Sequence, residues 1–229
     1  MKVQRLRIRF ARGEQVKFIT HLDLMRLWER ALRRANIDLA YSEGFTPHPR
    51  LSLAAPLAVG VTSSAEILDL FLNSRISPLE FARQVANQLP PGVEVLEVQE
   101  VGLRAPSVQS EVRWAEYQVR LESSLSAESV QGVVDAFLAA ESIPWEHQRD
   151  KEARKYDIRA LVHDLWLEQG EGGLMIGMRL RADNNGSGRP EQVILALGLP
   201  EPDRIHRSKL ILAESSPAHE AWRRHGRFT

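Results

Sequence analysis

The sequence predicts an α+β protein made of two tandem ferredoxin-like halves, each with the element order β-α-β-β-α-β, the second half with an extra strand. Two observations carry this prediction: segments with period-two alternation interleave with capped helical segments in that order, and the order recurs after residue 112. The expected domains are 1–102 and 113–214, joined by a linker at 103–112 and followed by a loose basic and aromatic tail at 215–229.

The first half opens on a strand and a long helix. In "QRLRIRF", Leu6, Ile8 and Phe10 alternate with Arg5, Arg7 and Arg9, which is typical of a half-buried strand. "THLDLMRLWERALRRA" follows, with Thr20 as the expected N-cap and Asp23 three residues later. The apolar residues of this segment recur at helical spacing and predict one buried face.

The rest of the first half reads as extended segments around a second helix. Residues 50–60 are expected to be extended, and "AEILDLFL" predicts a strand. "SPLEFARQVANQLP" predicts a helix, because Ser77 offers a cap, Pro78 suits the first helical position and Glu80 completes a capping box. "GVEVLEVQEV" predicts the closing strand.

The second half repeats this order with less regular patterns. "AEYQVRLE" predicts a strand and "SAESVQGVVDAFLAA" a helix. "IPWEHQR" and "YDIRALVHDLWLE" read as extended, the latter with room for a bend, and "GLMIGMRLRA" reads as a strand. A turn at 183–188, a short helix from Pro190 and a final strand in "RIHRSKLILAE" complete the half.

Composition excludes several kinds of chemistry. The 229 residues include no cysteine, which excludes disulfides, thiolate zinc sites and an iron–sulfur cluster held by this chain alone. No phosphate-binding glycine loop, HExxH or GxSxG motif occurs. The N-terminus lacks the apolar region of a secretory signal and no apolar run reaches membrane-spanning length, so we expect a cytoplasmic protein without a membrane partner.

Charge is balanced overall but unevenly placed. Lys and Arg number 30, as do Asp and Glu, yet residues 1–50 hold eleven basic and five acidic residues, a net +6. The arginines of "QRLRIRF" allow two readings: phosphate contacts on an open sheet face, or cross-strand ion pairs with Glu66, Asp69, Glu94 and Glu97. The helix arginines Arg26, Arg30, Arg33 and Arg34 likewise fit either an anion-binding face or a solvated one.

The stretch "YSEGFTPHPR" is the most unusual in the chain. Its prolines remove two backbone donors and disfavour helix, so it predicts a stiff loop rich in rings. Phe45 offers a stacking face, Gly44 close backbone approach, and His48 and Arg50 phosphate contacts. An alternative is a rigid loop whose rings cover the core edge. With the helix start, the candidate substrate-binding residues are His21, Asp23, Arg26, Arg30, Tyr41, Ser42, Gly44, Phe45, Pro47, His48 and Arg50.

The run "KFITHLDLMRLWERALRRANIDLAYSEGFTPHPRLSLAAPLAVGVTSSAEILDL", with the later "DIRALV" and "RPEQVILALGL", resembles the uncharacterised domain family linked to radical SAM proteins. The resemblance covers roughly residues 3–213. Members are fused behind, or encoded beside, a cobalamin-binding radical SAM protein. It implies such a partner, which would carry SAM, the iron–sulfur cluster and cobalamin, whereas this chain would bind no cofactor.

Three functional hypotheses follow. The first is a non-catalytic accessory module that binds and presents a substrate, RNA above all, to the radical SAM partner. The second is an RNA-processing enzyme with His21 and His48 as proton-transfer groups, which paired ferredoxin-like folds permit only by analogy. The third is a protein-binding scaffold without nucleic-acid affinity. His21, Asp23 and His48 leave metal binding open, but their spacing fits no standard ligand signature and no metal site is assigned.

Overall fold

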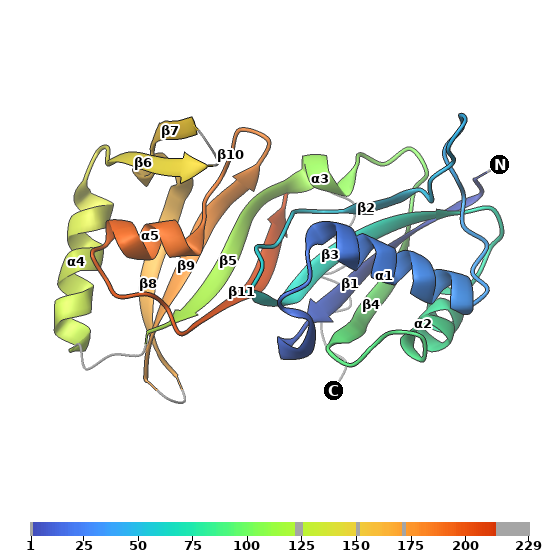
Figure 1. The fold of residues 1–229 in the computed structure, drawn as a ribbon, viewed down its shortest axis with the longest axis horizontal. Helices are drawn as coiled ribbons and strands as arrows, with labels where there is room; N and C mark the ends of the chain where they lie inside the picture. Colours follow the sequence, from blue (N-terminus) through green and yellow to red (C-terminus); the bar gives the residue numbers. More distant parts are fainter. Residues whose placement is uncertain (1, 122–125, 150–151, 171–172, 214–229) are drawn as a thin grey trace. The chain divides into compact units, whose positions relative to one another are not determined.

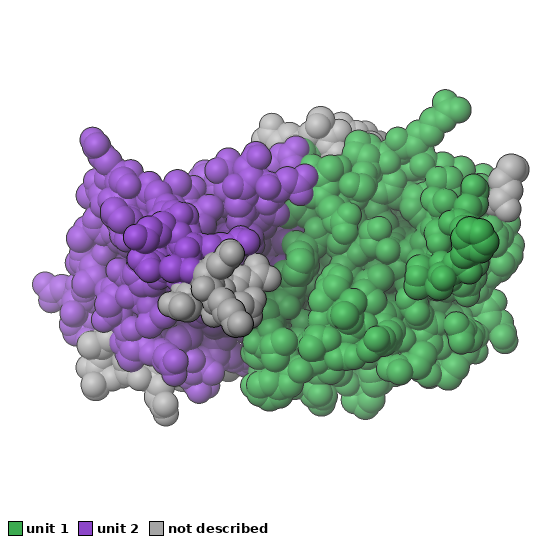
Figure 2. Space-filling view, turned by 45° about the horizontal axis from the view of Figure 1, so that its top comes forward, with its two compact units in different colours: residues 1–112, 212–229 green, residues 113–211 purple. Residues whose placement is uncertain are grey.

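The computed structural model describes residues 2–121, 126–149, 152–170 and 173–213 (Figure 1). This part of the chain is an α+β protein with mostly antiparallel strand pairs and five α-helices. It divides into two compact units, coloured separately in Figure 2: unit 1, residues 1–112 and 212–229, and unit 2, residues 113–211.

Unit 1 contains a four-stranded sheet in the order β4-β1-β3-β2, with all neighbouring strands antiparallel. The central strand β1 pairs through Ile8 with Leu68 on one side and Val98 on the other. In chain order the elements are β1 (Gln4–Arg12), η1 (Glu14–Val16), α1 (His21–Arg34), β2 (Leu51–Leu53), β3 (Thr62–Leu72), α2 (Pro78–Ala86), β4 (Val93–Val101) and α3 (Val108–Glu111).

The core of unit 1 forms where α1 and α2 meet one face of this sheet. Leu6, Ile8 and Phe10 are fully buried in one cluster with Trp28 of α1 and Phe81 of α2. Both predicted helix starts are confirmed: the Asp23 N–H donates to the Thr20 hydroxyl at 3.2 Å, and the Glu80 N–H donates to the Ser77 hydroxyl at 3.2 Å. The helices begin there because these side chains satisfy otherwise unpaired donors.

Unit 2 contains a sheet with the strand order β11-β5-β9, in which β8 and β10 both also pair with β9. A separate two-stranded sheet joins β6 and β7, and α4 packs against β8. The elements are β5 (Val112–Arg120), α4 (Ala127–Ala139), β6 (Pro144–Arg149), β7 (Glu152–Asp157), η2 (Arg159–Leu161), β8 (Val162–Gly170), β9 (Gly173–Asp183), β10 (Gly186–Ser187), α5 (Pro190–Ala196) and β11 (Arg204–Leu212).

The segment 156–168 bends after β7, as its sequence allowed, because the Asp157 carboxylate accepts the N–H groups of Ile143 at 2.9 Å and Arg159 at 3.0 Å and so turns the chain. Two other regions differ from the sequence prediction. Of the extended region 50–60, only β2 pairs as a strand. The predicted linker contains the helix α3, capped by Ser107. The predicted tail at 215–229 lies outside the described residues.

No helix in the described part of the chain combines the length and apolar character that crossing a bilayer requires.

Candidate functional sites

The loop 41–50 is closed at its base like a small hairpin. An isolated β-bridge joins Tyr41 to Pro49. The Ser42 N–H donates to the His48 carbonyl at 2.8 Å, and the His48 N–H donates to the Ser42 hydroxyl at 3.0 Å. The Arg50 guanidinium donates to the Tyr41 carbonyl at 3.1 Å. Short polar residues and proline therefore fix the shape of this segment without a strand ladder.

The tip of this loop presents an aromatic ring to solvent. Phe45 has a relative exposure of 109 %, and it is the most exposed large apolar side chain among the described residues. Gly44 has φ of +124°, a conformation that favours glycine, and no atom lies within 4 Å of a Cβ built there. The loop projects away from the rest of unit 1 (Figure 1). The expectation that its rings cover the core edge is thus wrong for Phe45.

The base of the loop is attached to the end of β3 beside two cations. The Ala40 N–H donates to the Phe71 carbonyl at 2.8 Å, and the Phe71 N–H donates to the Arg50 carbonyl at 3.1 Å. The Lys2 ammonium lies 4.8 Å from the centre of the Phe71 ring. The exposed ring at the tip is therefore carried on a sheet end that also holds Lys2 and Arg50.

The predicted residues at the start of α1 serve the helix end. The Asp23 carboxylate accepts the Thr20 hydroxyl at 2.7 Å and lies 3.5 Å from the Arg26 guanidinium. The Thr20 hydrogen bond, more than the Arg26 charge, lowers the pKa of Asp23. His21 is exposed as the first residue of the helix. This arrangement is a helix cap with one exposed ion pair.

The two candidate histidines lie at opposite ends of unit 1. His21 follows the end of β1, where Arg12 pairs with Ser63 of β3. The loop that holds His48 is attached at the other end of β3, where Leu39 bridges to Leu72. The nine residue steps from Ser63 to Leu72 span roughly 30 Å. The structure therefore does not bring His21 and His48 together, and the proton-transfer pair is wrong as a geometric prediction.

The basic face of α1 is only partly paired. Arg26 pairs with Asp23, and Arg34 donates to the Gln88 carbonyl at 2.5 Å. Arg30 and Arg33 are exposed, and among the described residues neither forms an ion pair. Two guanidinium groups on this helix thus remain accessible to an anion.

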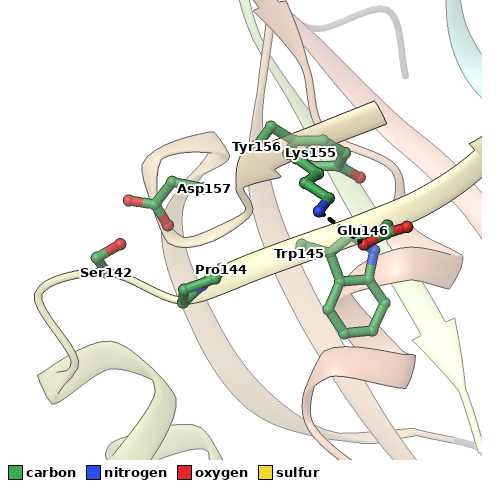
Figure 3. A pocket seen from close by; sticks show the side chains of 7 residues that line it. All are labelled: Ser142, Pro144, Trp145, Glu146, Lys155, Tyr156 and Asp157. Carbon is green, nitrogen blue, oxygen red and sulfur yellow. Dashed lines mark ion pairs between the residues drawn. The ribbon is translucent and has the colours of Figure 1, made fainter. Parts of the chain in front are cut away.

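Unit 2 contains a concave site that the sequence did not indicate. It has a volume of ≈ 560 Å³ and lies along the β6–β7 hairpin (Figure 3). Trp145 and Tyr156 are opposed in the two strands, and the Lys155 ammonium lies 3.6 Å from the Glu146 carboxylate. The lining residues are Ser142, Pro144, Trp145, Glu146, Lys155, Tyr156 and Asp157.

Most polar groups of this hollow already have structural partners. The Trp145 indole N–H donates to the Gln192 side chain at 2.8 Å. Burial raises the pKa of the Tyr156 hydroxyl, and the Ile143 N–H leads the hydrogen bonds that lower the pKa of Asp157. The register of the β6–β7 pair brings these residues together, and no local sequence pattern predicts that register.

The lowered pKa of Asp157 predicts a pH dependence of the hairpin. A carboxyl whose folded pKa lies below its unfolded value near 3.8 stabilises the fold above that value. We expect this contribution to be lost as the pH falls through the folded pKa, and to be absent in Asp157→Asn. Acid titration of Ile143 and Arg159 amide shifts by NMR measures it; equal titration curves in both proteins would contradict it.

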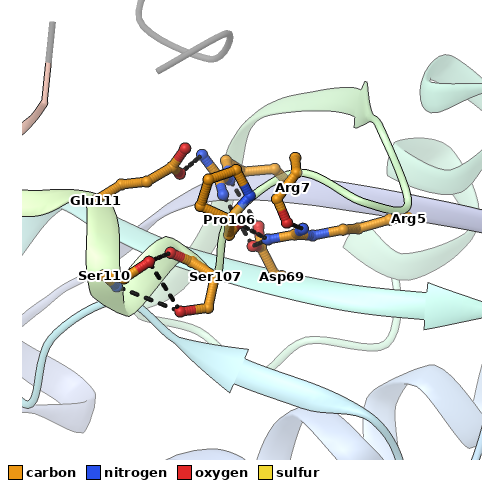
Figure 4. Close-up of polar contacts among 8 residues, drawn as sticks. Arg5, Arg7, Asp69, Pro106, Ser107, Ser110 and Glu111 are labelled. Atoms are coloured by element: carbon orange, nitrogen blue, oxygen red, sulfur yellow. Dashed lines mark hydrogen bonds and ion pairs between the residues drawn. The ribbon is translucent and has the colours of Figure 1, made fainter. Parts of the chain in front are cut away.

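The arginine ladder of β1 is a buried ion-pair network (Figure 4). Arg7 donates to both carboxylate oxygens of Asp69 at 2.7 and 2.9 Å, and Arg5 donates to the same carboxylate at 2.5 Å. Arg9, nearer the surface, pairs with Glu97 at 3.4 Å. The reading as cross-strand ion pairs is confirmed for these three arginines, and the reading as an open phosphate-binding face is wrong for Arg5 and Arg7.

The segment 103–111 completes this network. Arg5 also donates to the carbonyls of Ala105 at 2.6 Å and Pro106 at 2.7 Å, and Arg7 donates to the Glu111 carboxylate at 2.6 Å. Burial works to lower the pKa of Arg7, but its bonds with Asp69 and Glu111 outweigh burial and raise it. The sequence did not predict Glu111 as an ion-pair partner, because a helix of four residues is too short to show helical periodicity.

In the described ranges, no group of three or more His, Asp or Glu side chains is placed to hold a metal ion.

These features define an α+β protein with a ring-tipped loop, an accessible basic helix face and a hollowed hairpin. The chain belongs to a family of uncharacterised proteins conserved in bacteria (DUF2344), which matches residues 5–190. No curated protein matches the chain. Among solved structures, it is similar to a chain from "Crystal Structure of a Cbf5-Nop10-Gar1 Complex", with 11% identity and a TM-score of 0.48. That similarity covers 90% of this chain and 48% of the other, so this chain spans about half its length.

Proposed function

We propose that this protein is a non-catalytic module that binds RNA and presents it to a partner enzyme. The observation that carries the proposal is the fully exposed Phe45 at the tip of a closed, projecting loop. The resemblance of the sequence to the radical SAM-linked family supports a cobalamin-binding radical SAM protein as the partner. That partner would hold SAM, the iron–sulfur cluster and cobalamin, and this chain would hold none of them.

The loop has the properties that sequence-tolerant binding of a single strand requires. When an unpaired base stacks on an exposed ring, the stacking contact stabilises the complex by about 1–3 kcal/mol per base. The hydrogen bonds at the base of the loop constrain the backbone that carries the ring, which lowers the entropy lost on binding. Lys2 and Arg50 beside the loop base are suited to the adjoining phosphates.

The arrangement of strands supports the finer fold proposal of two ferredoxin-like halves. Unit 1 has the order β4-β1-β3-β2, and unit 2 has the corresponding order β11-β5-β9-β8 when the β6–β7 hairpin and β10 are taken as additions. Sheets of this kind with helices on one face are used for single-stranded RNA in other proteins. On this proposal the two halves are variations on one module.

RNA binding across a salt series tests the function. We expect the purified protein to bind mixed cellular RNA, with a log–log slope of about 0.7 per phosphate contact. Phe45→Ala should weaken binding by roughly 5- to 150-fold, which corresponds to the loss of one stacked base. Its free energy of unfolding should change by less than about 0.5 kcal/mol, because the ring has no packing to lose.

Leu79→Ala is the matched control, because Leu79 is another exposed apolar side chain, 63 % exposed, and it belongs to α2 and not to the loop. It should leave RNA affinity unchanged. If the wild-type protein binds no RNA at low salt, the proposal fails. Association with the radical SAM partner without RNA affinity would then favour the protein-binding scaffold.

A further inference from the structure

The strands of unit 2 carry a second set of side chains on the face opposite the buried one. In β5, Ala115, Tyr117 and Val119 are buried, and the alternate residues Trp114, Glu116 and Gln118 are partly exposed. Their neighbours in β9 follow the same alternation, since Gly177 pairs with Gln118 and Arg179 with Glu116. We call this the outer face of unit 2.

One aromatic ring lies flat on the outer face because a glycine lies beneath it. Trp166 of β8 is paired with Gly177 of β9. A Cβ built on Gly177 would lie 2.0 Å from Cε2 and 2.2 Å from Nε1 of the Trp166 indole. Such an approach is possible only without a side chain at 177, so one surface of the ring rests on the backbone. The other surface is directed away from the sheet.

The edge of the same ring is fixed by hydrogen bonds. The Trp166 N–H donates to one carboxylate oxygen of Glu168 at 2.6 Å. The other oxygen of Glu168 accepts the Gln118 side-chain amide at 3.1 Å. The Trp166 ring is therefore held from below by the backbone of Gly177 and at its edge by the hydrogen bond to Glu168. The polar groups of Glu168 and Gln118 lie beside it.

A pair of rings lies further along the outer face, beyond Trp166. Trp114 and His163 make an edge-to-face contact, with ring centres 4.8 Å apart and planes at 66°. Trp114 pairs with Arg181, four residues beyond Gly177 in β9. Four residues correspond to about 13 Å along a strand. This leaves room for two separate bases.

Guanidinium groups lie along β9 on this face. Arg179 donates through Nε and Nη2 to Glu116, at 3.0 and 2.7 Å, and Arg181 donates through Nε to Asp183 at 3.2 Å. Their side chains are 34 % and 35 % exposed, and within the described residues Nη1 of Arg179 and both Nη atoms of Arg181 donate to no partner. Each guanidinium group thus keeps N–H donors that can bond to a phosphate oxygen while its carboxylate partner stays in place.

We propose that the outer face of unit 2 is a second single-strand site, in which Trp166 stacks one unpaired base and Trp114 with His163 contacts another. Arg179 and Arg181 hold the phosphate between them, and the Glu168 carboxylate accepts a base amino group. The inference rests on the proposed function, since it names how RNA is held beyond loop 41–50. A fixed ring on a sheet is the arrangement by which four-stranded sheets stack bases in other proteins.

A fluorescein-labelled single-stranded RNA of about ten nucleotides is the probe. Trp166→Leu should weaken its binding by roughly 5- to 150-fold, and Trp166→Phe should restore most of the affinity because the stacking face returns. Trp145→Phe is the control, since Trp145 lies on the β6–β7 hairpin. Tryptophan fluorescence should be quenched by RNA in the wild type and in Trp145→Phe, and the quenching should fall in Trp166→Leu.

The outcomes separate the two proposals. If Phe45→Ala weakens binding but Trp166→Leu and Trp114→Leu bind and quench like the wild type, the second site is wrong and the loop proposal stands. If the wild-type protein binds no RNA, both are wrong. If Trp166→Leu does not fold, Trp114→Leu decides in its place: reduced affinity and quenching support the site, and wild-type values overturn it.

Discussion

Asp69→Ala is expected to destabilise the protein by about 3–5 kcal/mol, which is the usual effect of removing one partner from a buried ion pair. Asp69 is 2 % exposed, and its carboxylate is bonded to both Arg5 and Arg7. Without it, two buried guanidinium groups lose their shared counter-charge. Glu111 then remains as the partner of Arg7, whereas Arg5 keeps the backbone carbonyls of Ala105 and Pro106 and its contact with the Phe71 ring.

Guanidinium chloride or urea unfolding measures this change, and two matched variants show its origin. Glu97→Gln breaks the more exposed Arg9 pair and should cost less than about 1 kcal/mol. Replacing Arg5, Arg7 and Asp69 together with apolar residues of similar volume should cost much less than Asp69→Ala, because no buried charge is left unpaired. Equal costs for Asp69→Ala and Glu97→Gln would contradict a buried network.

Trp28→Ala is expected to cost about 3–5 kcal/mol, as for other large-to-small aromatic substitutions in a core. Trp28 is fully buried on α1, and its ring meets Phe10 edge-to-face with centres 5.0 Å apart. The substitution removes this contact and leaves a cavity between α1 and the sheet. Unfolding by denaturant, followed by circular dichroism, measures the loss.

Trp28→Phe should behave very differently. The Trp28 indole N–H is buried and has no hydrogen-bond partner among the residues that the structure describes. Phenylalanine keeps most of the apolar ring and removes this unsatisfied donor, whose burial costs about 1–3 kcal/mol. We therefore expect Trp28→Phe to lie within about 1 kcal/mol of the wild type, since the gain offsets the lost volume. A cost close to that of Trp28→Ala would contradict this account of the indole.

The sequence predicted elements well where local rules decide them. Strict alternation placed Leu6, Ile8 and Phe10 on one face, and the caps at Thr20 and Ser77 fixed two helix starts. Charges at alternate positions in neighbouring strands even identified Asp69 as a partner of the arginines. In each case a single physical rule acts over a few residues, so the sequence alone predicts the structure there.

The candidate sites were less predictable because they depend on register and chain path. Loop 41–50 was recognisable from its prolines, but nothing local shows that Phe45 has no contact with the core. The separation of His21 from His48 follows from the ends of β3 to which each is attached. Trp166 meets Gly177 only through the pairing of β8 with β9, and β8 contains a register shift between Val162 and Asp164.

The contacts of residues 103–111 bear on where this chain can be divided. A fragment ending at residue 102 would lose the carbonyls of Ala105 and Pro106 and the carboxylate of Glu111, all of which bond to arginines of the first strand. Its most basic strand would then carry uncompensated charge, and solubility and nucleic-acid binding of the fragment would report that exposure. The smallest piece whose behaviour represents the first unit therefore extends through residue 112.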